Sequence, residues 1–241
     1  MKLVEVPKIL PQAVGGPVQF RLGKLAGRAD FDAGTLTPKL ASRKLPIRSE
    51  LLAYRQGIAG VSALQSGWAA LVELLADGRR QIVHLVLPGE IIAYPRPGRC
   101  LASATAIAIT PVEVCTWRIS EDPVVAGAQL QALGASDAVE QTCMINQITR
   151  LGRRSAYERL AHFLLEIRER LMLAGIGNGK IFQMPLTQEL IADVLGLTSV
   201  HINRTLQQLR QDGYLNLRSG VMDFPDPDRL IDIVDYRSVV A

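Results

Sequence analysis

The chain has 241 residues, of which 48% are hydrophobic and 21% are charged, so it is long and apolar enough for one large or two small globular domains and is not a disordered protein. It contains no apolar run of about eighteen residues and no long apolar core after Lys2, so neither a membrane span nor a signal peptide is expected. The net charge of +4 is concentrated in residues 146–220, where ten Lys and Arg stand against six Asp and Glu, and this excess permits an anionic partner such as DNA.

The first 45 residues carry few structural signals. Prolines and glycines predict a loose start, at Pro7, Pro11, Gly15, Gly16 and Pro17. A short helix is expected near Phe31–Ser42. We therefore treat residues 1–45 as an N-terminal segment without a defined fold.

Glycines punctuate residues 46–120 at intervals of nine to eleven residues, at Gly57, Gly67, Gly78, Gly89 and Gly98. The segments "LVELLADG", "RRQIVHLVLPG" and "PVEVCTW" are rich in β-branched and apolar residues and predict strands. "ADGRR" predicts a hairpin turn between the first two of them. Short strands with regular turns are typical of an antiparallel sandwich, roll or barrel.

Helical periodicity replaces the strand pattern after residue 120. In residues 121–154 a narrow stripe recurs at intervals of three and four residues, and this stripe predicts a coiled-coil-like seam between two helices. It consists of Ala138, Gln141, Ile145 and Ile148. A second, amphipathic helix follows, with a broad apolar face formed by Ala156, Leu160, Phe163, Leu164, Ile167 and Leu171.

Residues 155–241 contain two short helices joined by a tight turn. Thr187 is placed to cap a helix over Gln188–Leu195, and Thr198 to cap a second helix from Ser199 to about Gln211. Gly196 supplies the positive φ that the turn between them needs. The segment around Arg218-Ser219-Gly220 alternates like a hairpin. Apolar residues bridge the two helices, namely Ile191, Leu195, Leu197, Ile202 and Leu206, with the small Ala192 facing the partner helix.

The second helix, "LTSVHINRTLQQLR", has an unusual outer face. Either Val200 or Ile202 can complete its apolar side, whereas the outer side carries Ser199, His201, Asn203 and Arg204. Short side chains let a backbone approach DNA base edges, and an arginine can donate two hydrogen bonds to a guanine. Free N–H groups at Thr187 and Gln188 suit a phosphate, as does Arg218 at the hairpin tip. Helix pairs of this kind also occur in α-helical domains that bind no DNA, and spacing alone does not separate the two.

The segment "GRRSAYERLAHFLLEIRERL…FQMPLTQELIADVLGLTSVHINRTLQQLRQDGYL" closely resembles the C-terminal half of Crp/Fnr-family bacterial transcription regulators. The glycine-marked pattern "YRQG…LQSGWAALVELLADGRRQIVHLVLPGE" extends the resemblance over about residues 46–235. It implies an α+β fold with an N-terminal cyclic-nucleotide-binding-like antiparallel β-roll, a long dimerisation helix and a C-terminal winged helix-turn-helix. It also implies a homodimer that binds palindromic promoter sites in the cytoplasm, with RNA polymerase as a further candidate partner.

The same resemblance assigns base-reading positions to Ser199, Val200 and Arg204, with His201 and Asn203 alongside. Val200 stands where the family usually has a glutamate. A valine cannot accept a hydrogen bond from a cytosine amine, but it can pack on a thymine methyl. The resemblance therefore moves Val200 to the groove-facing side. It implies a half-site that differs from the commonest family consensus, or one that is read less stringently at that base pair.

The β-roll predicted for residues 46–120 lacks the residues with which members of the family bind cyclic nucleotides. Cyclic-nucleotide binders in the family hold the phosphate with a Gly-Glu pair and an Arg-Ser/Thr pair, whereas this chain reads "PGEIIAYPRPGRCLASATA", with Ala102 before Ser103. Arg96 and Arg99 are close in sequence but lie in a shortened loop. We therefore expect no control by cAMP or cGMP. The roll is left with an unknown ligand in a remodelled pocket or with none.

Other cofactors are equally unsupported, and we expect no metal or cofactor. An iron–sulfur cluster needs four cysteine ligands, and the chain has three isolated cysteines, a sparse set that fits a reducing cytosol. Cys100 and Cys115 are interpreted as buried thiols, whereas Cys143 lies on the dimer helix, where a redox role stays open. His84 is interpreted as a structural histidine.

Two rival functions follow from other classes. An enzyme is disfavoured because the chain has no phosphate-binding glycine loop, nucleophile elbow or metalloprotease motif. The alternative is a ligand-binding regulatory module that acts through protein contacts without DNA binding. Such a module would need neither Arg204 on a short polar face nor a basic wing.

Overall fold

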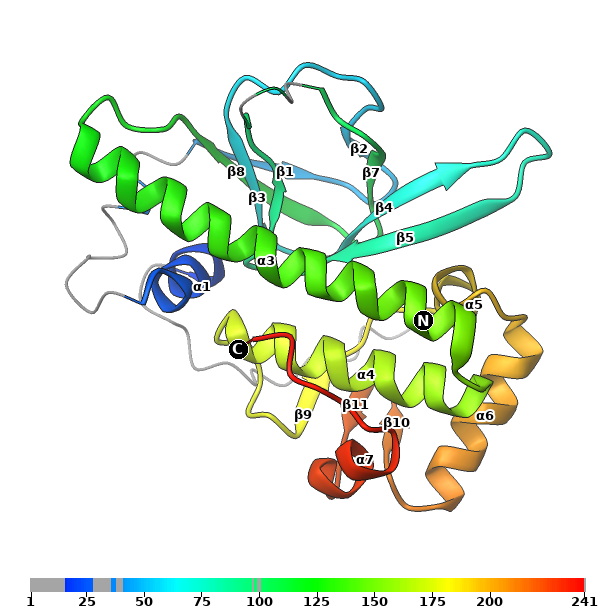
Figure 1. Cartoon of the computed structure of the whole chain (residues 1–241). Helices are drawn as coiled ribbons and strands as arrows, with labels where there is room; N and C mark the ends of the chain where they lie inside the picture. The colour runs from blue at the N-terminus through cyan, green and yellow to red at the C-terminus, as the bar shows by residue number, and fades with distance from the viewer. Residues whose placement is uncertain (1–15, 28–35, 38–40, 97, 99–100, 241) are drawn as a thin grey trace.

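Two four-stranded antiparallel sheets make up the N-terminal half of the protein, and helices make up most of the C-terminal half (Figure 1). The computed structural model describes residues 16–27, 36–37, 41–96, 98 and 101–240. A long helix, α3 (Pro123–Arg153), runs past the sheets, and α4 (Ala156–Leu173) lies beside it. The α+β fold predicted from the sequence is confirmed, with the roll, the long helix and the winged helix-turn-helix in the expected order.

The two sheets of the roll share an apolar core. Leu64, Val86 and Val114 belong to one buried cluster that takes side chains from both sheets, because alternate residues of a strand face inward. The first sheet has the order β1 (Ala41–Leu45), β8 (Val112–Trp117), β3 (Val61–Ser66) and β6 (Ile91–Ala93). The second has the order β2 (Glu50–Leu52), β7 (Thr105–Ala108), β4 (Ala69–Leu74) and β5 (Arg80–Val86). Strand β1 lies before residue 46, so the sheets begin earlier than the predicted range.

The hairpin predicted at "ADGRR" joins β4 to β5. The amide of Leu75 donates to the carbonyl of Arg79 over 2.8 Å, and Gly78 adopts a φ of 85°, which favours glycine. The paired strands project away from the body of the roll (Figure 1). The two ends of β5 therefore have different neighbours. Arg80 at its start pairs with Asp193 near the C-terminal end of the later helix that covers residues 188–195, whereas Val86 at its end is buried in the core of the roll.

The N-terminal segment departs from its prediction at Pro17. A helix, α1 (Pro17–Ala26), begins at this proline because the fixed φ of proline suits the first helical position, whose N–H needs no partner. Gly27, with a φ of 63°, ends it. Val18 and Leu22 are buried against β3 and α3, so tertiary packing stabilises a helix that composition alone conceals.

Two other predictions fall at the edge of the described residues. The short helix expected at 31–42 lies mostly outside them, and its last two positions are wrong because Ala41 and Ser42 belong to β1. Cys100 and Arg99 also lie outside the described residues.

Helix α3 has one buried and one exposed side. Asp122 caps it by accepting hydrogen bonds from the amides of Val124 and Val125. Leu133, Val139 and Cys143 on the inner side are buried. The predicted stripe lies on the outer side of the helix and is exposed, with Ile145 58% and Ile148 72% exposed, beside Ala138 and Gln141.

Helix α4 forms the centre of the C-terminal core. A capping box joins Ser155 and Glu158 at its start, and its predicted apolar face is buried from Leu160 to Leu171. Around it lie α5 (Gln188–Leu195), α6 (Ser199–Gln211), α7 (Pro227–Ile233) and a three-stranded sheet with the order β10 (Asn216–Arg218), β11 (Val221–Asp223), β9 (Ile181–Gln183).

A chain of buried charges connects the roll to these helices. The Arg150 guanidinium pairs with Glu166 over 2.7 Å, Glu166 lies 3.6 Å from Arg170, and Arg170 pairs with Glu90 over 2.6 Å. Arg21 of α1 approaches Glu90 at 3.8 Å. All five side chains are at most 7% exposed. The chain thereby joins α1, the turn after β5, α4 and α3.

The ion pairs decide the charge states in this interior. Burial opposes ionisation of Glu90, but Arg170 and Arg21 outweigh it and lower the pKa of Glu90 to about 2. His84 contacts Arg170 at 3.2 Å, and burial together with this cation lowers the pKa of His84 to about 4. His84 is therefore a neutral side chain that contacts the buried polar chain.

Removing one member of this chain should strongly destabilise the fold. Arg170→Met leaves Glu90 and Glu166 as buried charges without their central partner, so we expect the free energy of unfolding to fall by about 3–5 kcal/mol. Arg79→Met is the matched control, because the ion pair of Arg79 with Asp77 is exposed and should contribute at most about 1 kcal/mol. Guanidinium denaturation followed by circular dichroism measures both. Equal losses for the two variants would show that the buried chain does not stabilise the fold.

Candidate nucleic-acid interface

Helices α5 and α6 form a tight helix-turn-helix whose ends are fixed by local hydrogen bonds. The hydroxyl of Thr187 accepts from the amide of Leu190, and that of Thr198 accepts from the amide of His201, each over 3.2 Å. Gly196 takes the left-handed conformation, with a φ of 61°. The amide of Leu197 returns to the carbonyl of Ala192, which closes the turn. Both helices have the boundaries that the sequence predicts.

A buried apolar face holds α6 against α4 and α5. Ile191 and Leu195 of α5 pack with Ile202 and Leu206 of α6 in the cluster that also contains Leu160. Ala192 is buried as well, and Leu197 is half-buried against the same cluster. The bridging residues predicted from the sequence therefore all contribute to this contact.

The opposite face of α6 points to solvent. Ile202 is fully buried whereas Val200 is 75% exposed, so burial settles which of the two completes the apolar side. Ser199, His201, Asn203 and Arg204 are exposed beside Val200. Within the described part of the chain, the Arg204 side chain makes no hydrogen bond or ion pair. Its five N–H donors are therefore available to a partner.

A hydrogen bond that the sequence does not predict connects this face of α6 to α5. The amide of Asn203 donates to the side-chain oxygen of Gln188 over 3.1 Å, which connects α6 to the first residue of α5. The two residues are fifteen positions apart, so only the helix-turn-helix geometry brings them together. Thr187 is exposed as well, but its hydroxyl already serves the cap.

The hairpin β10–β11 lies beside the helix-turn-helix as a wing. Ser219 and Gly220 form its two-residue loop with φ values of 50° and 75°, the pattern of a tight hairpin turn with two left-handed residues. Arg218 is exposed at the last position of β10, and no ion pair of its side chain is present among the described residues. The wing therefore presents a cation near its tip.

Two glutamines attach the C-terminal end of α5 to the rest of the molecule. Gln147 of α3 donates to the carbonyl of Val194. Gln81 of β5 donates to the carbonyls of Asp193 and Val194 over 2.7 and 3.3 Å, and Arg80 pairs with the Asp193 carboxylate. These contacts leave no pattern in the sequence, because their partners are 47 to 113 positions apart. The orientation of the helix-turn-helix therefore depends on both the roll and the long helix.

The two described cysteines lie in the interior of the protein. Cys115 and Cys143 are buried, and burial raises the pKa of Cys115 to about 11 and that of Cys143 to about 12. Neither thiol is therefore in the reactive thiolate form near neutral pH, and Cys143 faces the interior rather than the exposed stripe. Among the described residues, no group of three or more His, Cys, Asp and Glu side chains could hold a metal ion.

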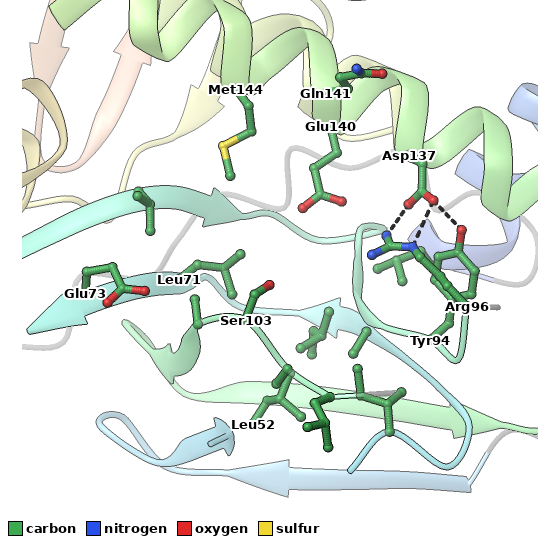
Figure 2. A pocket seen from close by; sticks show the side chains of 18 residues that line it. Leu52, Leu71, Glu73, Tyr94, Arg96, Ser103, Asp137, Glu140, Gln141 and Met144 are labelled. Atoms are coloured by element: carbon green, nitrogen blue, oxygen red, sulfur yellow. Dashed lines mark hydrogen bonds and ion pairs between the residues drawn. The ribbon is translucent and has the colours of Figure 1, made fainter. Parts of the chain in front are cut away.

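A cavity of about 560 Å³ lies between the roll and α3. Its guanidinium, Arg96, donates to Asp137 through Nε over 3.0 Å and stacks on the ring of Tyr94 at 4.5 Å, while Tyr94 also donates to Asp137 (Figure 2). Ala102 and Ser103 line the same cavity. Arg96 lies close in sequence to the segment with which cyclic-nucleotide binders of the family hold the phosphate. Its guanidinium is thus already paired with the Asp137 carboxylate.

Comparison with known proteins gives one consistent result. Residues 158–233 match the model of the Crp-like helix-turn-helix domain. The transcriptional activator protein FnrL of Cereibacter sphaeroides is 30% identical over 240 residues, which cover 90% of this chain and 89% of FnrL. The nitrogen fixation regulation protein FixK of Bradyrhizobium diazoefficiens is 36% identical over 171 residues, which cover 68% of this chain and 69% of FixK.

A solved structure extends the agreement to the fold. FixK2 from Bradyrhizobium japonicum superposes with a TM-score of 0.70 at 26% identity, over 83% of this chain and all of that one. These relatives are transcription regulators and not enzymes. Among the described residues, no helix combines the length and the apolar character needed to cross a membrane. The identity with FnrL over most of both chains, together with the helix-turn-helix match, shows that the chain belongs to the Crp/Fnr family of DNA-binding transcription regulators.

Proposed function

We propose that the protein binds palindromic promoter sites in the cytoplasm as a homodimer and that α6 reads each half-site in the major groove. The observation that carries this proposal is the exposed Arg204, unpaired within the described chain, on a helix whose opposite face is fully buried. A recognition helix needs this arrangement, because its backbone must be rigid while its donors stay free for base edges. RNA polymerase is the further partner that the family implies.

The base contacts are assigned to one side of α6. Arg204 would donate two hydrogen bonds to a guanine, and Ser199 would let the helix approach closely. Val200 would pack on a thymine methyl, and His201 would lie alongside. Asn203 is supported as a groove residue by its bond to Gln188, which fixes the orientation of its amide.

Phosphate contacts are assigned to the edges of this surface. The N-terminus of α5 at Thr187 and Gln188 offers backbone N–H groups that have no partner within the helix, and it offers the positive end of a helix dipole; both favour an anion. Arg218 at the wing would meet the backbone on the other side. These contacts position the protein without reading sequence.

Dimerisation is assigned to the exposed stripe of α3. Ala138, Gln141, Ile145 and Ile148 recur at intervals of three and four residues, which is the repeat of a two-helix seam. Two isoleucines that are more than half exposed on one stripe of α3 form an apolar surface that favours burial against a second copy. A two-fold axis along α3 would present two recognition helices to a palindrome.

We propose that cAMP does not control the protein. The cavity offers no free guanidinium among the described residues, since Arg96 is bound to Asp137, and Ala102 stands where a phosphate-binding arginine is expected. The rival function, a module that acts through protein contacts alone, loses support because residues 158–233 match a helix-turn-helix domain.

Arg204→Ala should weaken discrimination between a specific site and random DNA by about 5- to 150-fold, because one bidentate base contact is worth about 1–3 kcal/mol. Arg210→Ala is the matched control, with the same charge change at an exposed position in the last turn of α6. Arg218→Ala should instead reduce the slope of log affinity against log salt by about one. Gel shifts over a salt series measure all three. If Arg204→Ala discriminates as well as Arg210→Ala, α6 does not read the site through Arg204.

Val200→Glu should change the preferred half-site at one base pair. The glutamate would accept from a cytosine amine at the position where Val200 packs on a thymine methyl. Selection of binding sites from random DNA by both proteins measures the change. Selection of the same base by both proteins would remove Val200 from the groove.

Ile145→Glu should yield monomers, because a carboxylate buried in the seam would lie close to its symmetry mate. Ile47→Glu is the matched control, since Ile47 is similarly exposed at 54% but lies in the roll. Analytical ultracentrifugation measures the mass of each variant. A dimeric Ile145→Glu protein would place the seam elsewhere.

A further inference from the structure

The side chains of Asn203 and Gln188 connect the two helices of the helix-turn-helix on their outer face. The Nδ2 of Asn203, on α6, donates a hydrogen bond to the Oε1 of Gln188, the first residue of α5, over 3.1 Å. Both side chains are exposed. Asn203 follows Val200 by one helical turn, so the two residues are neighbours on the surface that we assign to base contacts. A side chain outside the recognition helix therefore contacts that surface.

The fold sets the distance between the two side chains. Gln188 begins α5 directly after the Thr187 cap, and Ile191, in the first turn of the same helix, is buried. Ile202, which directly precedes Asn203, is buried in the same apolar cluster. Because both backbones are anchored in the core, the hydrogen bond forms without any movement of the helices.

The hydrogen bond determines which atoms of the Asn203 amide remain for a partner. A primary amide has one oxygen that accepts and one nitrogen with two N–H donors. One N–H of Asn203 is bound to Gln188, so the Oδ1 and the second N–H are left, and within the described residues neither makes a hydrogen bond. Asn203 thus presents an acceptor and a donor side by side.

An acceptor beside a donor matches adenine in the major groove. Adenine offers the N6 amine as a donor and N7 as an acceptor, and an asparagine amide can bind both atoms at once. Guanine offers two acceptors, O6 and N7, and so requires donors. If Gln188 instead donated to the Oδ1 of Asn203, the amide would turn its N–H donors rather than its oxygen toward the base. The direction of one hydrogen bond therefore distinguishes the two purines.

A DNA phosphate would favour the direction that the structure shows. The side chain of Gln188 lies at the N-terminus of α5, where we assign a phosphate contact. Since the Oε1 of Gln188 accepts from Asn203, its Nε2 is left to donate to that phosphate. In the reversed pair the Gln188 oxygen would be the atom left for the phosphate, and two acceptors repel each other. Binding of the backbone thus reinforces the orientation of the Asn203 amide.

We propose that Gln188 is a positioning residue, which orients the Asn203 amide so that each half-site must carry an adenine at the base pair that Asn203 faces. The side chain of Gln188 touches no base in this arrangement. The proposal rests on the proposed DNA-binding function and deepens it, because it adds a side chain of the first helix to the selection of sequence.

Selection of binding sites from random DNA locates the base pair. The full-length protein and Asn203→Ala are compared under the same conditions. We expect one adenine in each half-site that the unaltered chain selects and that Asn203→Ala does not select. Competition gel shifts between duplexes with adenine and with guanine at this position then measure the preference.

Two variants of Gln188 separate the orientation of the amide from the affinity for DNA. Gln188→Glu keeps an acceptor for the Asn203 amide, so the adenine preference should be retained although the added negative charge weakens overall binding. Gln188→Lys offers donors only, so the preference should fall at least about tenfold although the added positive charge strengthens overall binding. A residue that contacts only phosphate would change the affinity and leave the preference unaltered.

Gln211→Lys is the matched control, because it makes the same substitution at the exposed last residue of α6, about 12 Å along the helix from Asn203, and should keep the preference. Circular dichroism establishes that each variant is folded. The proposal is overturned by absence of an adenine that depends on Asn203, by an unchanged preference in Gln188→Lys, or by equal losses in Gln188→Glu and Gln188→Lys. If the protein does not read DNA at all, Arg204→Ala also leaves discrimination unchanged, whereas a failure confined to Gln188 leaves the effect of Arg204→Ala intact.

Discussion

The buried chain of charges from Arg150 through Glu166 and Arg170 to Glu90 is the constraint on which the rest of the structure depends. Each ion would cost several kcal/mol in an apolar interior without its partners, so the groups are tolerated only where the geometry satisfies all of them together. The partners come from α3, α4 and the turn after β5. Any relative shift of these three elements would separate charges, and the fold therefore fixes their arrangement more strictly than apolar contact alone would.

The helix-turn-helix inherits its orientation from this arrangement. Gln147, whose side-chain oxygen accepts from Arg150, uses its amide to hold the carbonyl of Val194. Gln81 holds the same carbonyl from the roll. The polar end of α5 thus has two anchors, one on the long helix and one on the β4–β5 hairpin. The recognition surface of α6 is rigid relative to these anchors, since Ile202 and Leu206 are buried in the core shared by α4 and α5.

The sequence predicts the parts of this structure that depend on local chemistry. Thr187, Gly196 and Thr198 mark the boundaries of α5 and α6 because capping and a positive φ are decided within a few residues. The helix α1 is missed because Gly16 and Pro17 resemble a loop, and only burial of Val18 and Leu22 reveals why the helix forms. The pairing of Arg170 with Glu90 spans 80 positions, and the contact of Gln81 with Val194 spans 113. Such contacts leave no local pattern, so only the folded chain shows that the interface and the roll are joined.

Helix α3 shows how a single element can serve three environments. With about 3.6 residues per turn, positions 137, 140 and 144 form one strip, positions 138, 141, 145 and 148 an adjacent strip, and positions 143, 147 and 150 a third. The first strip faces the cavity, the second is exposed and the third lies in the charged interior. Because the strips share one rigid backbone, a rotation of α3 that relieves a contact in one environment must alter the other two.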